Sequence, residues 1–271
     1  MTEQGLAGRL VTTYATTELL NQATAARILI ELGDVLASRP RADLALTGGR
    51  DACDLYADVA AHPLAGSVDW SRVHLWWSDE RFVEPSDPER NAKQARDIWF
   101  GQLISDGLMP ESNIHEMPVD SRTNEEAEAA DDDENDARLA EAARAYDREL
   151  VGELGQDPRF DLAIFGVGPD GHFASLFPDR QEVLIDDPAN RVVGVSHSPK
   201  MPPLRVSLTV PVIRRSRKVW MFTSTPSKAH AVAQALSRTD DPHVPSSFAR
   251  GTQETRWLLD AQAAAELEGR A

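Results

Sequence analysis

The tripeptide Asp170-Gly171-His172 holds the side chains of this chain that are best suited to acid–base chemistry. Imidazole titrates near neutral pH, so a histidine can take a proton from water and later return it. An aspartate two residues earlier can orient the ring, and Gly171 permits a tight bend between the two side chains. We therefore predict that His172 is a general base supported by Asp170. The alternative is a loop with an ordinary surface histidine.

Two glycines, Gly48 and Gly49, separate a short apolar run from a helical pattern. Backbone N–H groups at the start of a helix attract anions, and glycine lets a ligand approach them closely. The pair predicts a phosphate-binding turn, although glycine also serves ordinary strand-to-helix turns. The surrounding residues match neither a Walker A loop nor the dinucleotide fingerprint, so nothing here indicates a nucleotide.

Further charged residues follow other apolar runs. Asp79 and Arg81 come directly after VHLWW, where an acid can handle protons and an arginine can hold an oxyanion or a phosphate. A solvated loop is the other interpretation. Arg205 and Lys228 are two cations expected at the same edge of a sheet. Each alone resembles a surface charge, but together with the glycine turn they would form a phosphate pocket.

Neither a metal site nor a disulfide framework is recognisable. His74, His115 and His197 are spaced unlike any known set of ligands, so we assign no metal. Cys53 is the single cysteine, which excludes an intramolecular disulfide. One cysteine and a first segment without a secretory pattern both favour a reducing cytoplasm.

The candidate residues follow apolar runs that alternate with amphipathic stretches along the chain. Strands are predicted at 43–47, 73–77, 160–167, 191–195, 218–224 and 256–260, and helices at 19–36, 51–61, 91–100, 137–154, 206–215 and 227–236. This alternation indicates an α/β fold: a single domain over residues 1–271, with a mostly parallel twisted sheet flanked by helices. Ligands bind beyond the carboxyl ends of such strands, where the polar clusters lie.

The composition excludes several classes of protein. Of the 271 residues, 41% are hydrophobic and 27% are charged, as in ordinary globular chains. No apolar stretch has the length of a membrane-spanning helix. The net charge of −16 disfavours nucleic acid as a partner. Eight acidic residues lie within 123–137, which we interpret as a solvated, mobile insertion.

Five segments taken together resemble the 6-phosphogluconolactonase family, over residues 44–257. They are LTGG, VHLWWSDERFVEPSDPERNAKQAR, FDLAIFGVGPDGHFASLFP, SPKMPPLRVSLTVPVI and VWMFTSTPSKAHAV. The resemblance implies a modified Rossmann-like fold, as in glucosamine-6-phosphate deaminases. It also implies hydrolysis of 6-phospho-D-glucono-1,5-lactone to 6-phospho-D-gluconate in the oxidative branch of the pentose phosphate pathway, with no metal and no organic cofactor.

The resemblance implies a role for each candidate residue. His172 matches the general base for the attacking water, and Asp170 matches the acid that supports it. The substrate and its phosphate are expected at a second group: Gly48, Gly49, Arg50, Asp79, Arg81, Lys200, Arg205 and Lys228. Either Arg81 or Lys200 would stabilise the oxyanion. Arg50 departs from the family, which usually has Ser or Thr there, so its role stays open.

Two other functions fit parts of the pattern. A glucosamine-6-phosphate deaminase shares the glycine turn and the DGH, but there the Asp-Glu pair leads into Tyr and a Glu follows the DGH. In this chain Arg81 follows the pair, and ASLFP comes soon after His172. A non-catalytic sugar-phosphate sensor usually carries a DNA-binding domain, for which the first 40 or so residues leave no room. We expect a monomeric cytoplasmic enzyme that acts on a sugar-phosphate lactone, without nucleic acid or membrane partners.

Overall fold

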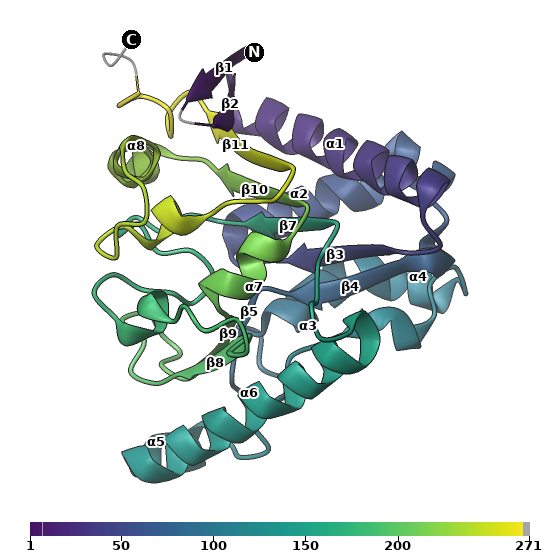
Figure 1. Ribbon diagram of the computed structural model, residues 1–271. Coiled ribbons are helices and arrows are strands. Elements are labelled where there is room, and N and C mark those ends of the chain that lie inside the picture. The colour runs from purple at the N-terminus through teal and green to yellow at the C-terminus, as the bar shows by residue number, and fades with distance from the viewer. Residues whose placement is uncertain (7, 268–271) are drawn as a thin grey trace.

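An eight-stranded sheet runs through the centre of the computed structural model, which describes residues 1–6 and 8–267 (Figure 1). The strands lie in the order β1-β2-β11-β10-β7-β3-β4-β6, and only β1 and β2 pair antiparallel. Their bounds are β1 Thr2–Leu6, β2 Arg9–Tyr14, β3 Ala42–Leu46, β4 Val73–Trp77, β6 Ile114–His115, β7 Leu162–Phe165, β10 Lys218–Thr223 and β11 Glu254–Asp260. The mostly parallel α/β architecture predicted from the sequence is confirmed.

Helices cover both faces of this sheet. Successive side chains of a strand point to opposite faces, and on β4 the Trp77 ring packs against Phe100 while the Trp76 ring packs against Tyr146. The helices are α1 Thr17–Ser38, α2 Arg50–Ala61, α3 Asn91–Ala95, α4 Gly101–Ser105, α5 Asn124–Ala129, α6 Asp132–Leu154, α7 Val210–Arg215 and α8 Ala229–Ser237. A π-helical turn at Arg96–Phe100 joins α3 to α4.

A second, antiparallel sheet carries three of the candidate residues, Asp79, Arg81 and Arg205. It consists of β5 Asp79–Arg81, β9 Arg205–Leu208 and β8 Val192–Val195, in that order. The prediction of a helix over 206–215 is wrong for 206–208, because β9 is paired on both sides and fully buried. The helix begins only at α7, where Pro211 occupies the first turn and its missing N–H costs no hydrogen bond.

The first two strands, β1 and β2, were not predicted from the sequence, where the first predicted strand begins at residue 43. The hairpin of β1 and β2 precedes α1, and β2 pairs with β11. β11 therefore lies inside the sheet, between β2 and β10. The run RLVTTY in β2 mixes polar threonines with apolar residues, so its burial depends on this pairing with a strand far away in sequence.

The acidic run 123–137 forms regular helix in the structure. Thr123 caps α5 by accepting a hydrogen bond from the N–H of Glu126, and the Glu126 carboxylate accepts one from the N–H of Thr123. Asp131 caps α6 through the N–H of Glu134. Acidic side chains stabilise the first turn of a helix because the helix dipole is positive there. The acidic residues that we interpreted as a solvated insertion thus also stabilise the starts of two helices. The mobility of the segment stays a prediction.

Candidate active site

Side chains from segments far apart in the sequence line one cavity of about 230 Å³. It lies beyond the carboxyl ends of β3, β7 and β10 and beside β5, which follows β4. The ends of neighbouring parallel strands meet at one edge of a sheet, and a ligand site is expected there. Eight of the sequence-predicted residues line this cavity: Gly48, Gly49, Arg50, Asp79, Arg81, His172, Arg205 and Lys228.

Asp170 and His172 form a hydrogen-bonded pair in the turn that follows β7. Nδ1 of His172 donates to Oδ1 of Asp170, since an ionised carboxylate only accepts. The Nε2 atom of the neutral ring is then free to accept a proton. Burial raises the pKa of Asp170, but the hydrogen bond from His172 and the positive charges of His172 and Lys200 outweigh it and hold this pKa below its usual value. The pair has the arrangement that general-base catalysis requires.

Two glycines make this turn possible. A Cβ atom at Gly168 would lie 2.1 Å from the His172 ring, so any side chain there would displace the imidazole. Gly171 has a φ of +86°, a left-handed conformation that favours glycine. The turn closes with hydrogen bonds from the N–H of Gly168 to the carbonyl of His172 and from the N–H of Gly171 to the carbonyl of Gly168, both 2.9 Å.

The glycine turn after β3 packs directly against Asn91, the first residue of α3. A Cβ atom at Gly48 would lie 1.7 Å from Oδ1 of Asn91. The same Oδ1 accepts a hydrogen bond from Arg81, and Nδ2 of Asn91 donates to the carbonyl of Asp79 at 2.9 Å. Asn91 therefore joins the glycine turn to the charged strand β5. The sequence analysis missed it, although it lies within one of the five segments quoted there.

Several residues that line the cavity are positively charged. Gly49, with a φ of +94°, precedes the first residue of α2, and the first residues of this helix line the cavity. The first N–H groups of a helix attract anions. Nζ of Lys228 donates to Oδ2 of Asp51 at 2.7 Å, and each side chain is 18% exposed. Arg50 is exposed at the same helix start. Asp51, which is not among the residues predicted from the sequence, is the partner of this lysine.

Arg205 holds the loop that precedes β9. Its guanidinium donates to the carbonyls of Lys200, Met201 and Pro202 at 3.0–3.1 Å and lies over the Phe177 ring. Burial lowers the pKa of Arg205 to about 10, with the charge of Arg81 acting in the same direction. The Nε and NH2 groups of Arg205 thus donate to carbonyls of the protein, and only its NH1 group is left for the predicted contact with phosphate.

Lys200 differs from the other predicted residues in its position. Its side chain is exposed and does not belong to the lining of the cavity, although its charge acts on Asp170. Asp79 does line the cavity, but its carboxylate is engaged, since Oδ2 accepts a hydrogen bond of 2.7 Å from the buried Ser175 hydroxyl. The geometry thus gives Arg81 a more direct place at the cavity than Lys200.

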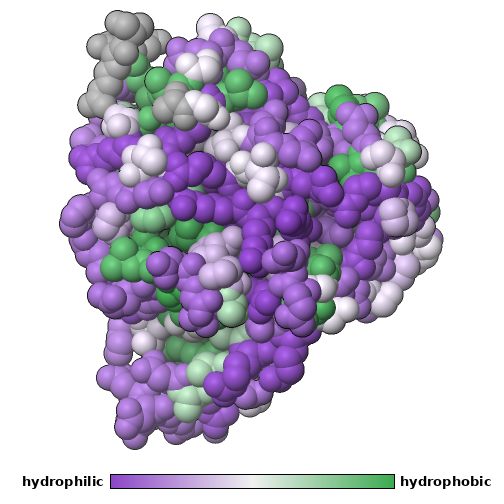
Figure 2. Space-filling view, viewed as in Figure 1, coloured by the Kyte–Doolittle hydropathy of each residue, from purple (hydrophilic) through white to green (hydrophobic). Residues whose placement is uncertain are grey.

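A larger groove of about 640 Å³ lies beside this cavity. Figure 2 shows apolar side chains in a hollow above α5, within a largely hydrophilic face. The apolar lining comes from the residues after β5, from the loop before β9 and from α5 with the residue that follows it. Four acidic residues line the groove as well: Asp87, Glu89, Glu128 and Asp132. Like charges repel, so these acids make the groove unfavourable for a phosphorylated ligand. The smaller cavity is the better candidate for such a ligand.

A cavity at the carboxyl edge of a parallel sheet, with a glycine turn, a helix start and several cations, is typical of α/β proteins that bind small anions. The Asp170–His172 pair adds an acid–base group to that class of site. None of the helices in the described part of the chain has the length and hydrophobicity needed to cross a membrane.

Comparison with known proteins identifies the family of the chain. It belongs to the family described as glucosamine-6-phosphate isomerases/6-phosphogluconolactonase, whose model matches residues 15–257. A 6-phosphogluconolactonase of Streptomyces coelicolor is 40% identical over 255 residues, covering 92% of this chain and 91% of that protein. One of Mycobacterium tuberculosis is 39% identical over 257 residues, covering 94% and 96%. The crystal structure of one from Thermotoga maritima, 24% identical, shares the fold with a TM-score of 0.74 over 92% of this chain and 99% of that one.

Proposed function

We propose that this protein hydrolyses 6-phospho-D-glucono-1,5-lactone to 6-phospho-D-gluconate, a step of the pentose phosphate pathway. The relatives that are 39–40% identical over most of the chain are named for this activity. The observation that carries the proposal is one cavity lined by two chemically different groups. One group is a histidine paired with an aspartate, and the other, the cationic group, is a glycine turn with Arg50, Arg205 and Lys228.

The cationic group of the cavity lining would bind the phosphate. The N–H groups at the start of α2 point toward an anion there, and Lys228 exchanges its partner Asp51 for a phosphate oxygen. Arg50, where related sequences usually have a hydroxyl, adds a second positive charge at the rim. The NH1 group of Arg205 completes this set, and the lactone ring then extends toward His172.

His172 would act as the general base. Its Nε2 takes a proton from water while the water oxygen forms a bond to C1 of the lactone, and the imidazolium is stabilised by Asp170. The tetrahedral intermediate then collapses, the bond between C1 and the ring oxygen breaks, and His172 returns its proton to that oxygen. The products are a carboxylic acid, which ionises at neutral pH, and a free 5-hydroxyl group.

Arg81 is the residue we assign to the developing oxyanion. It lines the cavity, and Asn91 and the carbonyl of Glu89 fix its guanidinium. Lys200, the other candidate, lies outside the lining. Removing one donor from an oxyanion site typically lowers the rate by about 10²–10³-fold.

The decisive experiment is a coupled assay on freshly generated lactone, in which 6-phosphogluconate is followed with its dehydrogenase above the spontaneous background. Glucosamine 6-phosphate is assayed in parallel, with ammonia release as the readout. We expect lactone hydrolysis and no ammonia. Release of ammonia without lactone hydrolysis would show that the protein is a deaminase instead. If neither reaction occurs, a protein that only binds a sugar phosphate becomes the better interpretation.

His172→Ala tests the assignment of the base. General-base catalysis contributes about 10²–10⁴-fold, so we expect kcat to fall by that factor while KM changes little. Full activity in this variant would refute the role of His172. His230→Ala is the matched control, because His230 is exposed and paired with Glu266 far from the cavity lining.

A further inference from the structure

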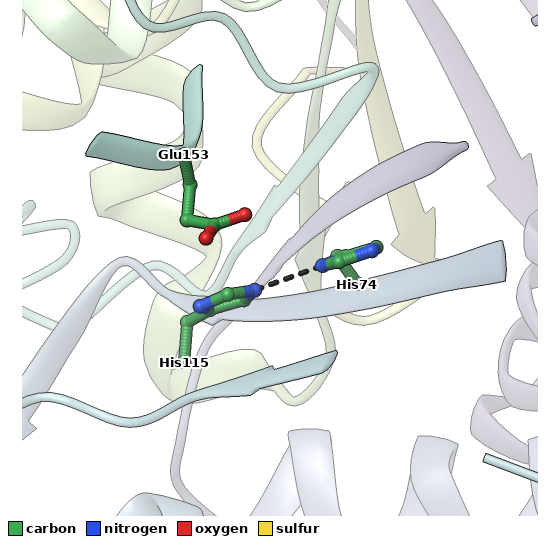
Figure 3. Close-up of side chains that lie close together, drawn as sticks. All are labelled: His74, His115 and Glu153. Carbon is green, nitrogen blue, oxygen red and sulfur yellow. Dashed lines mark hydrogen bonds between the residues drawn. The ribbon is translucent and has the colours of Figure 1, made fainter. Parts of the chain in front are cut away.

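Two histidines outside the candidate active site lie next to each other on the face of the sheet that α6 covers. Nδ1 of His74, on β4, is 2.9 Å from Nε2 of His115, on β6. Figure 3 shows Glu153, from the last turn of α6, reaching toward the same pair. His115 is 4% exposed, and its ring stacks on Trp76 with a centroid distance of 3.8 Å. The two histidines are 41 positions apart in the sequence, which hides this proximity.

The hydrogen bonds around His115 determine which nitrogen carries its proton. Nδ1 lies 2.8 Å from Oε1 of Glu149, and a carboxylate accepts, so Nδ1 is the protonated nitrogen. The Nε2 atom of a neutral His115 therefore presents its lone pair to Nδ1 of His74. A carboxylate that holds the far nitrogen of an imidazole is the usual support of a histidine that binds a metal.

The third group completes a set of metal-binding atoms. One ligand atom from each of His74, His115 and Glu153 lies within 4.8 Å of the other two. Oε2 of Glu153 accepts a hydrogen bond from Arg41 at 3.0 Å, which leaves Oε1 as the available oxygen. Two imidazoles and one carboxylate suit zinc and its neighbours among the transition metals.

We propose that His74, His115 and Glu153 form a binding site for a divalent transition metal, with zinc as the best match. In this state the metal replaces the proton between the two facing nitrogens. Zinc–nitrogen bonds of about 2.0–2.1 Å in tetrahedral geometry place the nitrogens about 3.3 Å apart, so the present spacing has to open by only a few tenths of an ångström. Water supplies the fourth ligand, because Glu153 is exposed.

The metal would join three elements at a distance from the candidate active site. His74 is the second residue of β4, whereas Asp79 and Arg81 follow the end of that strand. Glu153 lies at the end of α6, so binding links β4 and β6 to the helix that covers them. We therefore assign the site a stabilising role, separate from lactone hydrolysis.

The test uses the full chain, without an affinity tag and freed of metal by chelation. Calorimetric titration with Zn²⁺ measures stoichiometry and affinity, the visible absorption of added Co²⁺ reports tetrahedral coordination, and thermal unfolding is followed with and without Zn²⁺. We expect one equivalent to bind and to raise the Tm. His74→Asn and Glu153→Gln should each weaken binding by at least tenfold, and both keep the buried His115 in place.

Two further variants sharpen the result. Glu149→Gln removes only the group that orients His115, so affinity should fall by about 10–100-fold. Arg41→Gln removes a positive charge beside Glu153 and should tighten binding. His230→Asn, which breaks another His–Glu pair, is the control and should bind like the unaltered chain. Absence of binding, or equal affinity in His74→Asn and the unaltered chain, would overturn the proposal whatever the lactone assay gives.

Discussion

At the scale of single residues, the contact between Gly48 and Asn91 joins the glycine turn to the charged strand β5. Asn91 is 2% exposed and can hold Arg81 and the Asp79 carbonyl together only because Gly48 has no side chain. Neither residue needs to touch the substrate for its replacement to matter. The contact positions Arg81, and its effects should be measurable in turnover.

Gly48→Ala should therefore lower activity without unfolding the protein. The new methyl group overlaps the Asn91 amide, which has to rotate away and release Arg81. If Arg81 serves the oxyanion, kcat should fall by about 10²-fold. Steady-state kinetics with the lactone and a thermal melt measure both outcomes.

The double variant Gly48→Ala/Asn91→Ala shows whether the effect passes through Asn91. Substitutions that act through one contact are not additive. We expect the double variant to be no slower than Asn91→Ala alone. Additive losses would mean that the methyl group at residue 48 acts on the substrate directly.

Lys228 provides the corresponding test of the proposed phosphate site. A charged hydrogen bond contributes about 1.5–3 kcal/mol, so Lys228→Ala should raise KM by roughly 10–100-fold with a smaller effect on kcat. Asp51→Asn frees the lysine from its partner and should lower KM. An unchanged KM in both variants would remove Lys228 from the phosphate site.

Residue types and spacing were sufficient to predict most of the charged side chains that line the cavity. His172, the cations and the glycine turn all follow strands in an order that the fold brings to one edge. Asn91 and Asp51 were missed because their importance depends on how closely α3 and α2 approach β5 and Lys228. A short hydrogen bond between distant segments leaves no pattern in the sequence.

At the scale of elements, buried Glu80 fastens β5 to the start of α3. Its carboxylate accepts hydrogen bonds of 2.7–2.8 Å from the N–H groups of Arg81, Asn91 and Ala92. Burial raises the pKa of Glu80 to about 7, although the charge of Arg90 and these N–H groups lower it. The side chain is fully buried, so its ionisation affects the stability of the fold.

The sign of this effect gives a pH prediction. The pKa of Glu80 in the folded protein is above the ordinary 4.5, so the stability it contributes is present below pH 4.5 and is lost as the pH rises through 7. We expect the free energy of unfolding from urea titrations to decrease between pH 5 and pH 8, by on the order of 3 kcal/mol from this residue.

Glu80→Gln should abolish this part of the pH dependence, although the variant is less stable at every pH because an amide has only one acceptor. Glu111→Gln is the control, since Glu111 is exposed and should leave the decrease in place. A urea midpoint with the same pH dependence in Glu80→Gln and the unaltered protein would contradict the prediction.

Sequence periodicity predicted α1, α2, β4 and α6 well, but it failed for strands that form only by pairing with distant parts of the chain. α1, α2, β4 and α6 lie close to the predicted ranges, since each has a continuous apolar face or run. The sequence of β9 has a helical pattern, but this segment is a strand because it pairs with β5 and β8. The hairpin of β1 and β2 pairs with β11, which comes from the other end of the chain.

At the scale of the whole molecule, the net charge of −16 opposes the approach of an anionic substrate. Eight acidic residues lie in 123–137, on α5, at the N-cap of α6 and in the first two turns of α6, and this segment borders the acidic groove beside the cavity. Exposed charges act over about 8 Å at physiological ionic strength and over about 30 Å at 0.01 M salt. Their influence on substrate capture should therefore depend on salt.

Neutralising exposed acids of this segment should raise kcat/KM at low salt only. Glu125→Gln, Glu128→Gln and Asp136→Asn combined remove three negative charges without touching either helix cap. We expect a gain in kcat/KM near 0.01 M salt that disappears near 0.15 M, as screening of steering requires. A gain that is independent of salt would indicate a direct contact instead.

The position of β11 inside the sheet has a consequence for synthesis of the protein. While the ribosome is still translating residues 254–260, β10 has no partner on one side and the hairpin of β1 and β2 has nothing to dock on. The nascent chain then presents an apolar unpaired edge, KVWMFT, of the kind that pairs with other chains. A chain that ends before residue 254 should therefore aggregate rather than give a partly folded enzyme.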